Sequence, residues 1–324
     1  MTVPTVQLGN TGLHVPRLML GAEALGGHDW GDLDVSEVER ACSSAIELGL
    51  TFFDVADCYG LGLAEERLGR LVKSKRDQVV IATKFGVRVS GGKTRYDNSP
   101  GYMAEALEAS LKRLGTDYID LYQVHWPDGK TPLGEVFDAL ERHRTAGKIG
   151  AFGVSNLSLA DTAREPLPPH LASFSFEFSL ANREHEAEIR QTLARAPLSF
   201  LAWGPLGQGV LSGKYARNTQ FSADDRRSKP QWKNFHNNTL HKNLQIVDTM
   251  RTIAGELGDN ALPLTALAIA WNLHAVPGSV AIAGAKTVNQ VAENARALEL
   301  TLPPWAMERL DQVSTPHPPL AAAG

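Results

Sequence analysis

Short strand-like runs alternate with helix-like runs along almost the whole chain, and no other feature restricts the fold as strongly. An N-terminal hairpin is expected around Gly9–Gly12, and eight strand–helix pairs follow it. The expected strands are Leu18–Gly21, Thr51–Phe53, Val79–Thr83, Tyr118–Val124, Ile149–Val154, Phe174–Phe178, Leu198–Ala202 and Ser279–Ile282. The expected helices are Val35–Leu48, Ala64–Val72, Met103–Leu114, Leu133–Thr145, Leu159–Ala163, His185–Ala194, Asn243–Leu257 and Val288–Leu298. Eight such units in 324 residues favour a closed (β/α)₈ TIM barrel over an open doubly wound sheet.

The organisation of the chain predicts a single domain spanning residues 1–324, because no linker of domain-boundary length interrupts it. The proline-rich tail, residues 315–324, is expected to be extended or disordered. A long polar loop, Tyr215–Asn238, follows the seventh strand, and a loop of that length inside a compact domain is usually functional or disordered. A dinucleotide-binding Rossmann unit is disfavoured, because Gly60–Gly62 begins like G-x-G-x-x-G but Glu65 stands at the last glycine.

Charge and cysteine content exclude several partners. The net charge is −4 and no basic block is present, which argues against nucleic acid. Two cysteines cannot form a disulfide framework, which fits a reducing compartment. The N-terminus does not resemble a signal peptide, and the longest apolar stretch, Leu262–Ala270, is too short to span a bilayer. A cytoplasmic protein without a membrane partner is expected, and the sequence carries no indication of its oligomeric state.

Ionisable side chains stand at the ends of three consecutive expected strands. Asp54 follows the second strand with Tyr59 five positions later, Lys84 ends the third, and His125 follows the fourth. Each alone has an ordinary alternative: a packing tyrosine, a structural histidine, an aspartate that caps a turn, or a lysine beside a partner. Together they lie at the carboxyl ends of strands, where barrel active sites are built. The sequence therefore predicts one active site from all four.

Carbonyl reduction is the chemistry these four groups suit. A free tyrosine has a pKa of about 10, and a neighbouring ammonium such as Lys84 is expected to lower it. Asp54 would hold Lys84, His125 would orient the carbonyl, and Tyr59 would act as general acid. Neither H-E-x-x-H nor G-x-S-x-G occurs, so no metal is expected. The hydride must then come from a cofactor.

Asp54, Tyr59, Lys84 and His125 match, in type and order, the catalytic tetrad of the aldo-keto reductases, and the chain resembles that family from Leu8 to about Val313. The resemblance implies a nicotinamide cofactor site. The residues that it assigns to this site are Ser155, Asn156, Ser175, Trp203, Pro205, Leu206, Gly209, Leu211, Ser212, Lys214, Gly284, Lys286, Gln290, Glu293 and Asn294.

Family motifs give these residues separate expected roles. Ser155 and Asn156 would hold the nicotinamide carboxamide, and Trp203 would stack on the ring. The glycine-rich segment with Ser212 and Lys214 would approach the pyrophosphate. The remaining positions, 284–294, resemble the adenosine-binding segment after the last strand.

Two positions bear on the choice and strength of cofactor binding. Lys286 stands where its ammonium would contact the 2′-phosphate of a bound cofactor, which favours NADPH over NADH. The alternative is a solvated lysine at the start of a helix. Ser175 occupies the place of the family's usual glutamine in the run Ser175–Leu180. A serine is shorter and would reach the carboxamide through water, which predicts weaker cofactor binding.

The candidate substrate pocket comprises Glu23, Trp30 and Trp126. A carboxylate at position 23 would favour a polyol or a cationic group, unless it pairs with an arginine. Arg226 and Arg227 in the long loop are expected either to fold over the cofactor, to contact an anionic substrate, or to remain solvated.

Three functions are compatible with these residues. The first is NADPH-dependent reduction of an aldehyde or ketone, including a sugar or polyol carbonyl. The second is a cofactor-binding regulatory or scaffold subunit with little turnover, since the pattern of Trp203 with the 290–294 segment also resembles potassium-channel β subunits. A metal-dependent hydrolase is the third, and it is disfavoured because no His/Asp cluster with ligand spacing is present.

Overall fold

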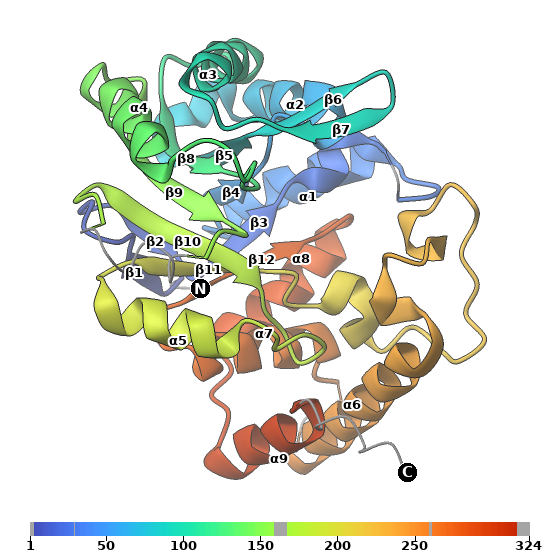
Figure 1. Cartoon of the computed structure of the whole chain (residues 1–324). Coiled ribbons are helices and arrows are strands. Elements are labelled where there is room, and N and C mark those ends of the chain that lie inside the picture. Colours follow the sequence, from blue (N-terminus) through green and yellow to red (C-terminus); the bar gives the residue numbers. More distant parts are fainter. Residues whose placement is uncertain (1–2, 29, 159–166, 259–260, 316–324) are drawn as a thin grey trace, which may run out of the picture.

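A computed structural model describes residues 3–28, 30–158, 167–258 and 261–315. Eight parallel strands close into a barrel in which β12 pairs with β3 (Figure 1). In chain order, the barrel strands are β3 (Leu18–Gly21), β4 (Phe52–Asp54), β5 (Val80–Phe85), β8 (Ile119–Val124), β9 (Ile149–Ser155), β10 (Leu171–Glu177), β11 (Ser199–Trp203) and β12 (Val280–Gly284). The (β/α)₈ architecture expected from the alternation is confirmed.

Helices surround the barrel (Figure 1). They are α1 (Val35–Glu47), α2 (Leu63–Val72), α3 (Pro100–Leu114), α4 (Leu133–Thr145), α5 (Glu186–Arg195), α6 (Asn237–Glu256), α7 (Leu264–Ala275), α8 (Val288–Ala295) and α9 (Pro304–Ser314). The expected helix at Leu159–Ala163 and the tail 316–324 lie outside the described residues.

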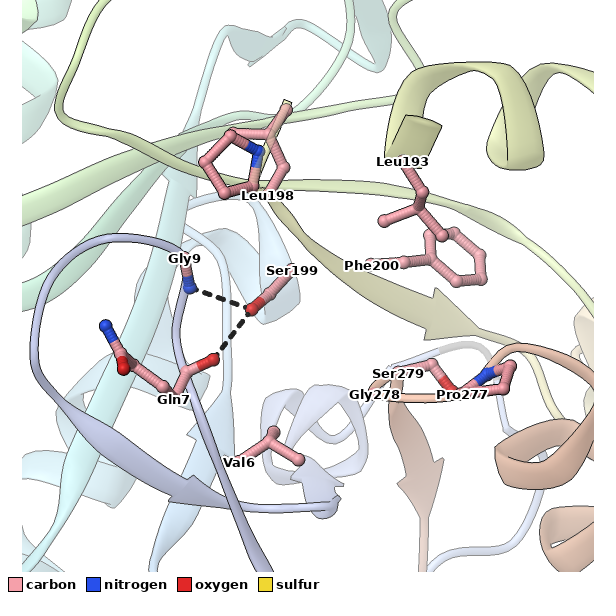
Figure 2. A pocket seen from close by; sticks show the side chains of 11 residues that line it. Val6, Gln7, Gly9, Leu193, Leu198, Ser199, Phe200, Pro277, Gly278 and Ser279 are labelled. Atoms are coloured by element: carbon pink, nitrogen blue, oxygen red, sulfur yellow. Dashed lines mark hydrogen bonds between the residues drawn. The ribbon is translucent and has the colours of Figure 1, made fainter. Parts of the chain in front are cut away.

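The N-terminal hairpin covers the amino end of the barrel. Its strands β1 (Thr5–Gln7) and β2 (His14–Pro16) pair antiparallel, and Leu8 beside them is fully buried in the same apolar cluster as the residues inside the barrel. Figure 2 shows how the hairpin is anchored: the Ser199 hydroxyl accepts a hydrogen bond from the Gly9 amide (2.9 Å) and donates one to the Gln7 carbonyl (3.2 Å). The functional cavity lies at the opposite end.

Strand periodicity places the ionisable residues inside the barrel. Phe52 and Ala82 belong to the interior cluster, and side chains two residues apart on a strand point the same way. Asp54 and Lys84 therefore face the interior one layer nearer the carboxyl end. His125 follows β8 directly, and its amide donates to the Phe85 carbonyl at 2.8 Å.

Several elements were not predicted from the sequence. Helix α7 is apolar on nearly every face, so it has no amphipathic stripe. Helix α9 was also missed, and α6 begins six residues before the expected Asn243. A hairpin of β6 (Val87–Ser90) and β7 (Lys93–Tyr96) projects beside the site. Helix α3 begins at Pro100, three residues earlier than expected, because the Ser99 hydroxyl accepts from the Tyr102 amide and proline suits the first turn.

The long loop after β11 is folded onto the molecule. Asp225 forms an antiparallel bridge with Trp30, so a segment late in the chain lies beside the loop that follows β3 (Figure 1). Inside the loop, the rings of Tyr215, Phe221 and Phe235 pack with centroids 5.0–5.7 Å apart. Among the described residues, no helix is both long and apolar enough to cross a membrane.

Candidate active site

A cavity of about 840 Å³ opens at the carboxyl ends of the strands, and all four members of the expected tetrad line it. Asp54, Lys84 and His125 come from β4, β5 and the end of β8, and Tyr59 comes from the turn after β4. The sequence prediction that these four residues converge therefore matches their positions.

Lys84 and Asp54 form a buried ion pair at the base of this cavity. Lys84 Nζ lies 2.7 Å from Asp54 Oδ1 and donates to the Val55 carbonyl at 3.0 Å. Only 5% and 7% of the two side chains are exposed. Burial raises the pKa of the Asp54 carboxyl, and the ammonium of Lys84 opposes that shift. Removing one partner of such a pair typically costs 3–5 kcal/mol, because the other charge is left buried and alone.

A turn in the left-handed region presents Tyr59. Gly60, Leu61 and Gly62 all have positive φ (58°, 56° and 98°). Gly60 lies so close to the Gly26 backbone that a Cβ would overlap it. Only glycine satisfies both conditions at position 60. The turn brings the Tyr59 ring edge-on to His125, with ring centroids 5.7 Å apart.

The pKa of Tyr59 moves in the direction opposite to the sequence expectation. Burial raises it well above 10, and the negative charges of Asp54 and Glu23 raise it further. Lys84 does not reverse this shift, because its ammonium faces Asp54 and lies 5.2 Å from the centroid of the tyrosine ring. Tyr59 is therefore protonated at neutral pH and able to donate its proton.

His125 is neutral. Burial, followed by the charge of Lys84, holds its pKa well below 6.5. Its Nδ1 contacts the Cys58 sulfur at 3.7 Å, and its carbonyl accepts from the Asn156 side-chain amide at 3.1 Å. Sequence reasoning did not single out Cys58, since a lone cysteine carries no motif.

Fourteen of the fifteen residues expected to bind the cofactor line the same cavity. They are Ser155, Asn156, Ser175, Trp203, Pro205, Leu206, Gly209, Ser212, Lys214, Gly284, Lys286, Gln290, Glu293 and Asn294. The exception is Leu211, whose side chain is fully buried in the hydrophobic core. Its expected contact with the cofactor stays a prediction and would come from its backbone.

Trp203 is held in place by a neighbour that was expected to bind the carboxamide. Asn156, itself in the left-handed region (φ 55°), accepts a hydrogen bond from the Trp203 ring nitrogen at 3.0 Å. Its amide also donates to the Ser155 hydroxyl at 3.0 Å. Ser175 lies beside these groups and is 2% exposed. The indole plane is thus fixed before any ligand is bound.

Positive charges gather where phosphates were expected. Lys286 lies near Lys214, Arg227 and Arg226, and burial together with these cations lowers its pKa from 10.5 to about 8. Its ammonium lies 4.7 Å from the centroid of the Trp30 ring. The alternative of a freely solvated Lys286 is therefore wrong. The excess of positive charge in a half-buried space suits an anion.

Backbone and hydroxyl groups complete the same region. Gly209 (φ 96°) and Gly213 (φ 80°) are left-handed, which lets the turn η4 (Gly207–Ser212) approach a ligand without intervening side chains. The Ser212 hydroxyl is buried and has no hydrogen-bond partner among the described residues. Together with the neighbouring cations, this unpaired hydroxyl fits a dinucleotide whose phosphates carry the negative charge.

The substrate side of the cavity is polar and aromatic. Glu23 pairs with Arg226 at 2.5 Å, which bears out the alternative that Glu23 meets an arginine. Arg226 lies over the rings of both Trp30 (4.7 Å) and Trp232 (5.1 Å), and Arg227 pairs with Asp225. These arginines are therefore not solvated. They tie the long loop to the start of the barrel.

The outer rim of this side includes Trp126, which is 38% exposed and whose ring lies 6.3 Å from that of Tyr96 in the β6–β7 hairpin. The hairpin was missed although Gly91–Gly92 between alternating residues is a turn signal. It gives the rim of the cavity a second aromatic wall.

The fold and this site are those of a barrel oxidoreductase, and the comparisons agree. The sequence model of the Aldo/keto reductase family matches residues 17–315. The chain is 33% identical to the aldo-keto reductase YhdN of Bacillus subtilis (strain 168) over 88% of its own length and 85% of that protein. It is 32% identical to a probable voltage-gated potassium channel subunit beta of Oryza sativa subsp. japonica, over 96% of both chains.

Solved structures give the same result. The glycerol dehydrogenase AKR11B4 from Gluconobacter oxydans is similar with a TM-score of 0.86 and 31% identity, covering 99% of both chains. An aldo-keto reductase from Klebsiella pneumoniae in complex with NADPH matches with a TM-score of 0.73 and 28% identity, covering 98% of this chain and 97% of that one. The chain belongs to the aldo/keto reductase family, and it is an NAD(P)H-dependent oxidoreductase.

Proposed function

We propose that this protein reduces an aldehyde or ketone with NADPH and that Tyr59 delivers the proton. The observation that carries the proposal is the convergence of Asp54, Tyr59, Lys84 and His125 in one cavity with the expected cofactor residues. When bound, the nicotinamide cofactor supplies the hydride. The protein's own groups bind the carbonyl, orient it, and provide the proton.

Tyr59 and His125 have complementary roles in this mechanism. The phenol O–H donates to the carbonyl oxygen, and its proton is transferred as negative charge develops there. Neutral His125 donates a second hydrogen bond from a ring N–H, which fixes the direction of the carbonyl. The Lys84 ammonium provides a positive charge 5.2 Å from the centroid of the ring that becomes the phenolate, and the carboxylate of Asp54 offsets part of that charge. Because the ammonium is already held at 2.7 Å by Asp54, it needs no reorganisation during the reaction.

NADPH is favoured over NADH by the cation cluster. Burial, followed by the charges of Arg227 and Lys214, lowers the pKa of Lys286, so repulsion among these cations is part of the cause. A cofactor with one additional phosphate relieves more of that repulsion. The NADPH complex of the Klebsiella relative supports the same choice.

The substrate we expect carries several hydroxyl groups. The Glu23–Arg226 pair offers both a hydrogen-bond acceptor and a donor at the mouth of the cavity, while Trp30 and Trp126 offer apolar faces. A sugar or polyol aldehyde matches this mixture, and the similarity to a glycerol dehydrogenase supports it.

The experiment is a fluorescence titration with NADPH and NADH, followed by absorbance at the nicotinamide band with aldehydes, ketones and sugars. Tight NADPH binding with turnover is expected, and the absence of binding to either cofactor would refute the proposal. Binding without turnover across the panel would favour a regulatory subunit, a role that the similarity to the rice channel subunit brings into consideration.

A further inference from the structure

His125, the histidine of the expected tetrad, contacts the side chain of Cys58 through one of its ring nitrogens. Cys58 Sγ lies 3.7 Å from His125 Nδ1, within hydrogen-bond distance for sulfur. Because Nδ1 faces the thiol, Nε2 is the ring nitrogen left for a substrate. Cys58 also lines the cavity and directly precedes Tyr59, so one turn places both side chains against the histidine.

The protonation states of the two groups limit what this contact can be. Burial raises the pKa of the Cys58 thiol to about 12, so the sulfur keeps its proton at neutral pH. The imidazole is neutral, as described above, and carries one proton on either Nδ1 or Nε2. If the thiol donates to Nδ1, the proton is on Nε2. If Nδ1–H donates to sulfur, Nε2 presents a lone pair.

The first arrangement is the stronger hydrogen bond and the productive one. An imidazole nitrogen accepts well, whereas a thiol sulfur is a weak acceptor. An Nε2–H donates to a carbonyl oxygen and supports its reduction, whereas an Nε2 lone pair repels that oxygen. The tautomer of a catalytic histidine is set by the partner of its other nitrogen.

We infer that Cys58 is a positioning residue that fixes His125 in the Nε2–H tautomer through an S–H···Nδ1 hydrogen bond. The inference rests on the proposed function for its catalytic meaning. Its structural part, the tautomer itself, is independent of any substrate.

A competing acceptor makes the thiol necessary. A carboxylate oxygen of Asp57, the Cys58 sulfur and a ring nitrogen of His125 lie within 4.8 Å of one another. Asp57 Oδ1 is buried and has no hydrogen-bond partner among the residues that the structure describes. Burial, followed by the charge of Glu65, raises the pKa of the Asp57 carboxyl to about 7, so it is an ionised acceptor above that pH. Without the thiol, the ionised carboxylate would draw a proton onto Nδ1 and leave the Nε2 lone pair facing the substrate. Lys84, Glu65 and Arg113 are the charged groups that act on Asp57.

The direct test is nitrogen-15 NMR of the histidine rings, which distinguishes protonated from unprotonated nitrogens without any turnover. The chain has 10 histidines, and the His125→Gln spectrum assigns the relevant one by difference. We expect Nε2–H in the wild type and a shift toward Nδ1–H in Cys58→Ala. Adding Asp57→Asn to Cys58→Ala should restore Nε2–H. Nδ1–H in the wild type, or an unchanged tautomer in Cys58→Ala, would overturn the inference.

Kinetics provide the second readout. Cys58→Ala should lower kcat for carbonyl reduction about tenfold, equivalent to about 1.4 kcal/mol, with the Kd for NADPH unchanged. Cys58→Ser, which retains a donor, should recover most of the loss. The matched control is Cys42→Ala, because Cys42 is the other cysteine and is buried in α1 away from the cavity. An effect on cofactor Kd as large as that on kcat would indicate a merely structural role.

The two proposals fail separately. If the wild type turns over no carbonyl compound but the tautomer responds to Cys58→Ala, the proposed function falls and the hydrogen bond stands. If the wild type is active and the tautomer does not respond, the function stands and the inference falls.

Discussion

Replacing Lys286 by methionine tests the choice of cofactor most sharply. Methionine keeps most of the length of the side chain beside Trp30 and removes the charge. A hydrogen bond to a charged group contributes about 1.5–3 kcal/mol, so Kd for NADPH should rise about 10- to 150-fold. Kd for NADH, which lacks the 2′-phosphate, should change less than threefold on the same reasoning. Fluorescence titration measures both values, and Lys242→Met, at an exposed position in α6, is the control.

The same variant has a predicted effect on stability. The pKa of Lys286 falls from 10.5 to about 8 on folding, so the folded protein binds fewer protons than the unfolded chain between these values. Wild-type stability should therefore rise with pH across that window. The side chain is partly exposed, and solvent screening reduces the effect to about 1 kcal/mol. Lys286→Met should lack this rise in chemical denaturation at pH 8 and pH 10.

In the fluorescence titration, equal changes in Kd for NADPH and NADH on Lys286→Met would refute the phosphate contact.

The remaining predictions concern three further residues. Tyr59→Phe should lower kcat about 10²- to 10⁴-fold in steady-state assays and leave the Kd for NADPH nearly unchanged, because it removes only the proton donor; retained turnover would contradict the acid role. Asp54→Asn should reduce the free energy of unfolding by about 3 kcal/mol in urea denaturation, because the buried ammonium of Lys84 loses its counter-ion; a change below about 1 kcal/mol would show that water compensates. Ser175→Gln should tighten cofactor binding in the fluorescence titration if a direct carboxamide contact is missing, and an unchanged Kd would mean that the serine already serves through water.

Sequence reasoning found the barrel and the tetrad because both depend on local patterns. Asp54 and Lys84 stand at the carboxyl ends of expected strands, and their convergence follows because such ends meet at one face of a parallel barrel. The pairing of Glu23 with Arg226 joins positions 203 residues apart, and no periodic pattern encodes such a contact. Helix α7 was missed for a physical reason: a helix buried on all sides has no polar face to reveal its period.

The direction of the Tyr59 pKa was missed for another reason. The sequence indicated that Lys84 was near the phenol and that Asp54 would hold the ammonium, but it could not show how completely the phenol is buried. Burial then outweighs the remaining positive field. The role of Cys58 depended on a side-chain orientation, which only the three-dimensional arrangement reveals.

The seam between β12 and β3 has a consequence for the synthesis of this protein. Ala281–Gly284 pair with Leu18–Gly21, so the first barrel strand waits for almost the whole chain before its second neighbour exists. At roughly 5–20 residues per second, that delay is on the order of tens of seconds. During this time the nascent half-barrel has an open edge of unpaired backbone groups, which is a template for association with other chains. The interval between the synthesis of β3 and that of β12 is therefore when this edge most needs to be shielded from other chains.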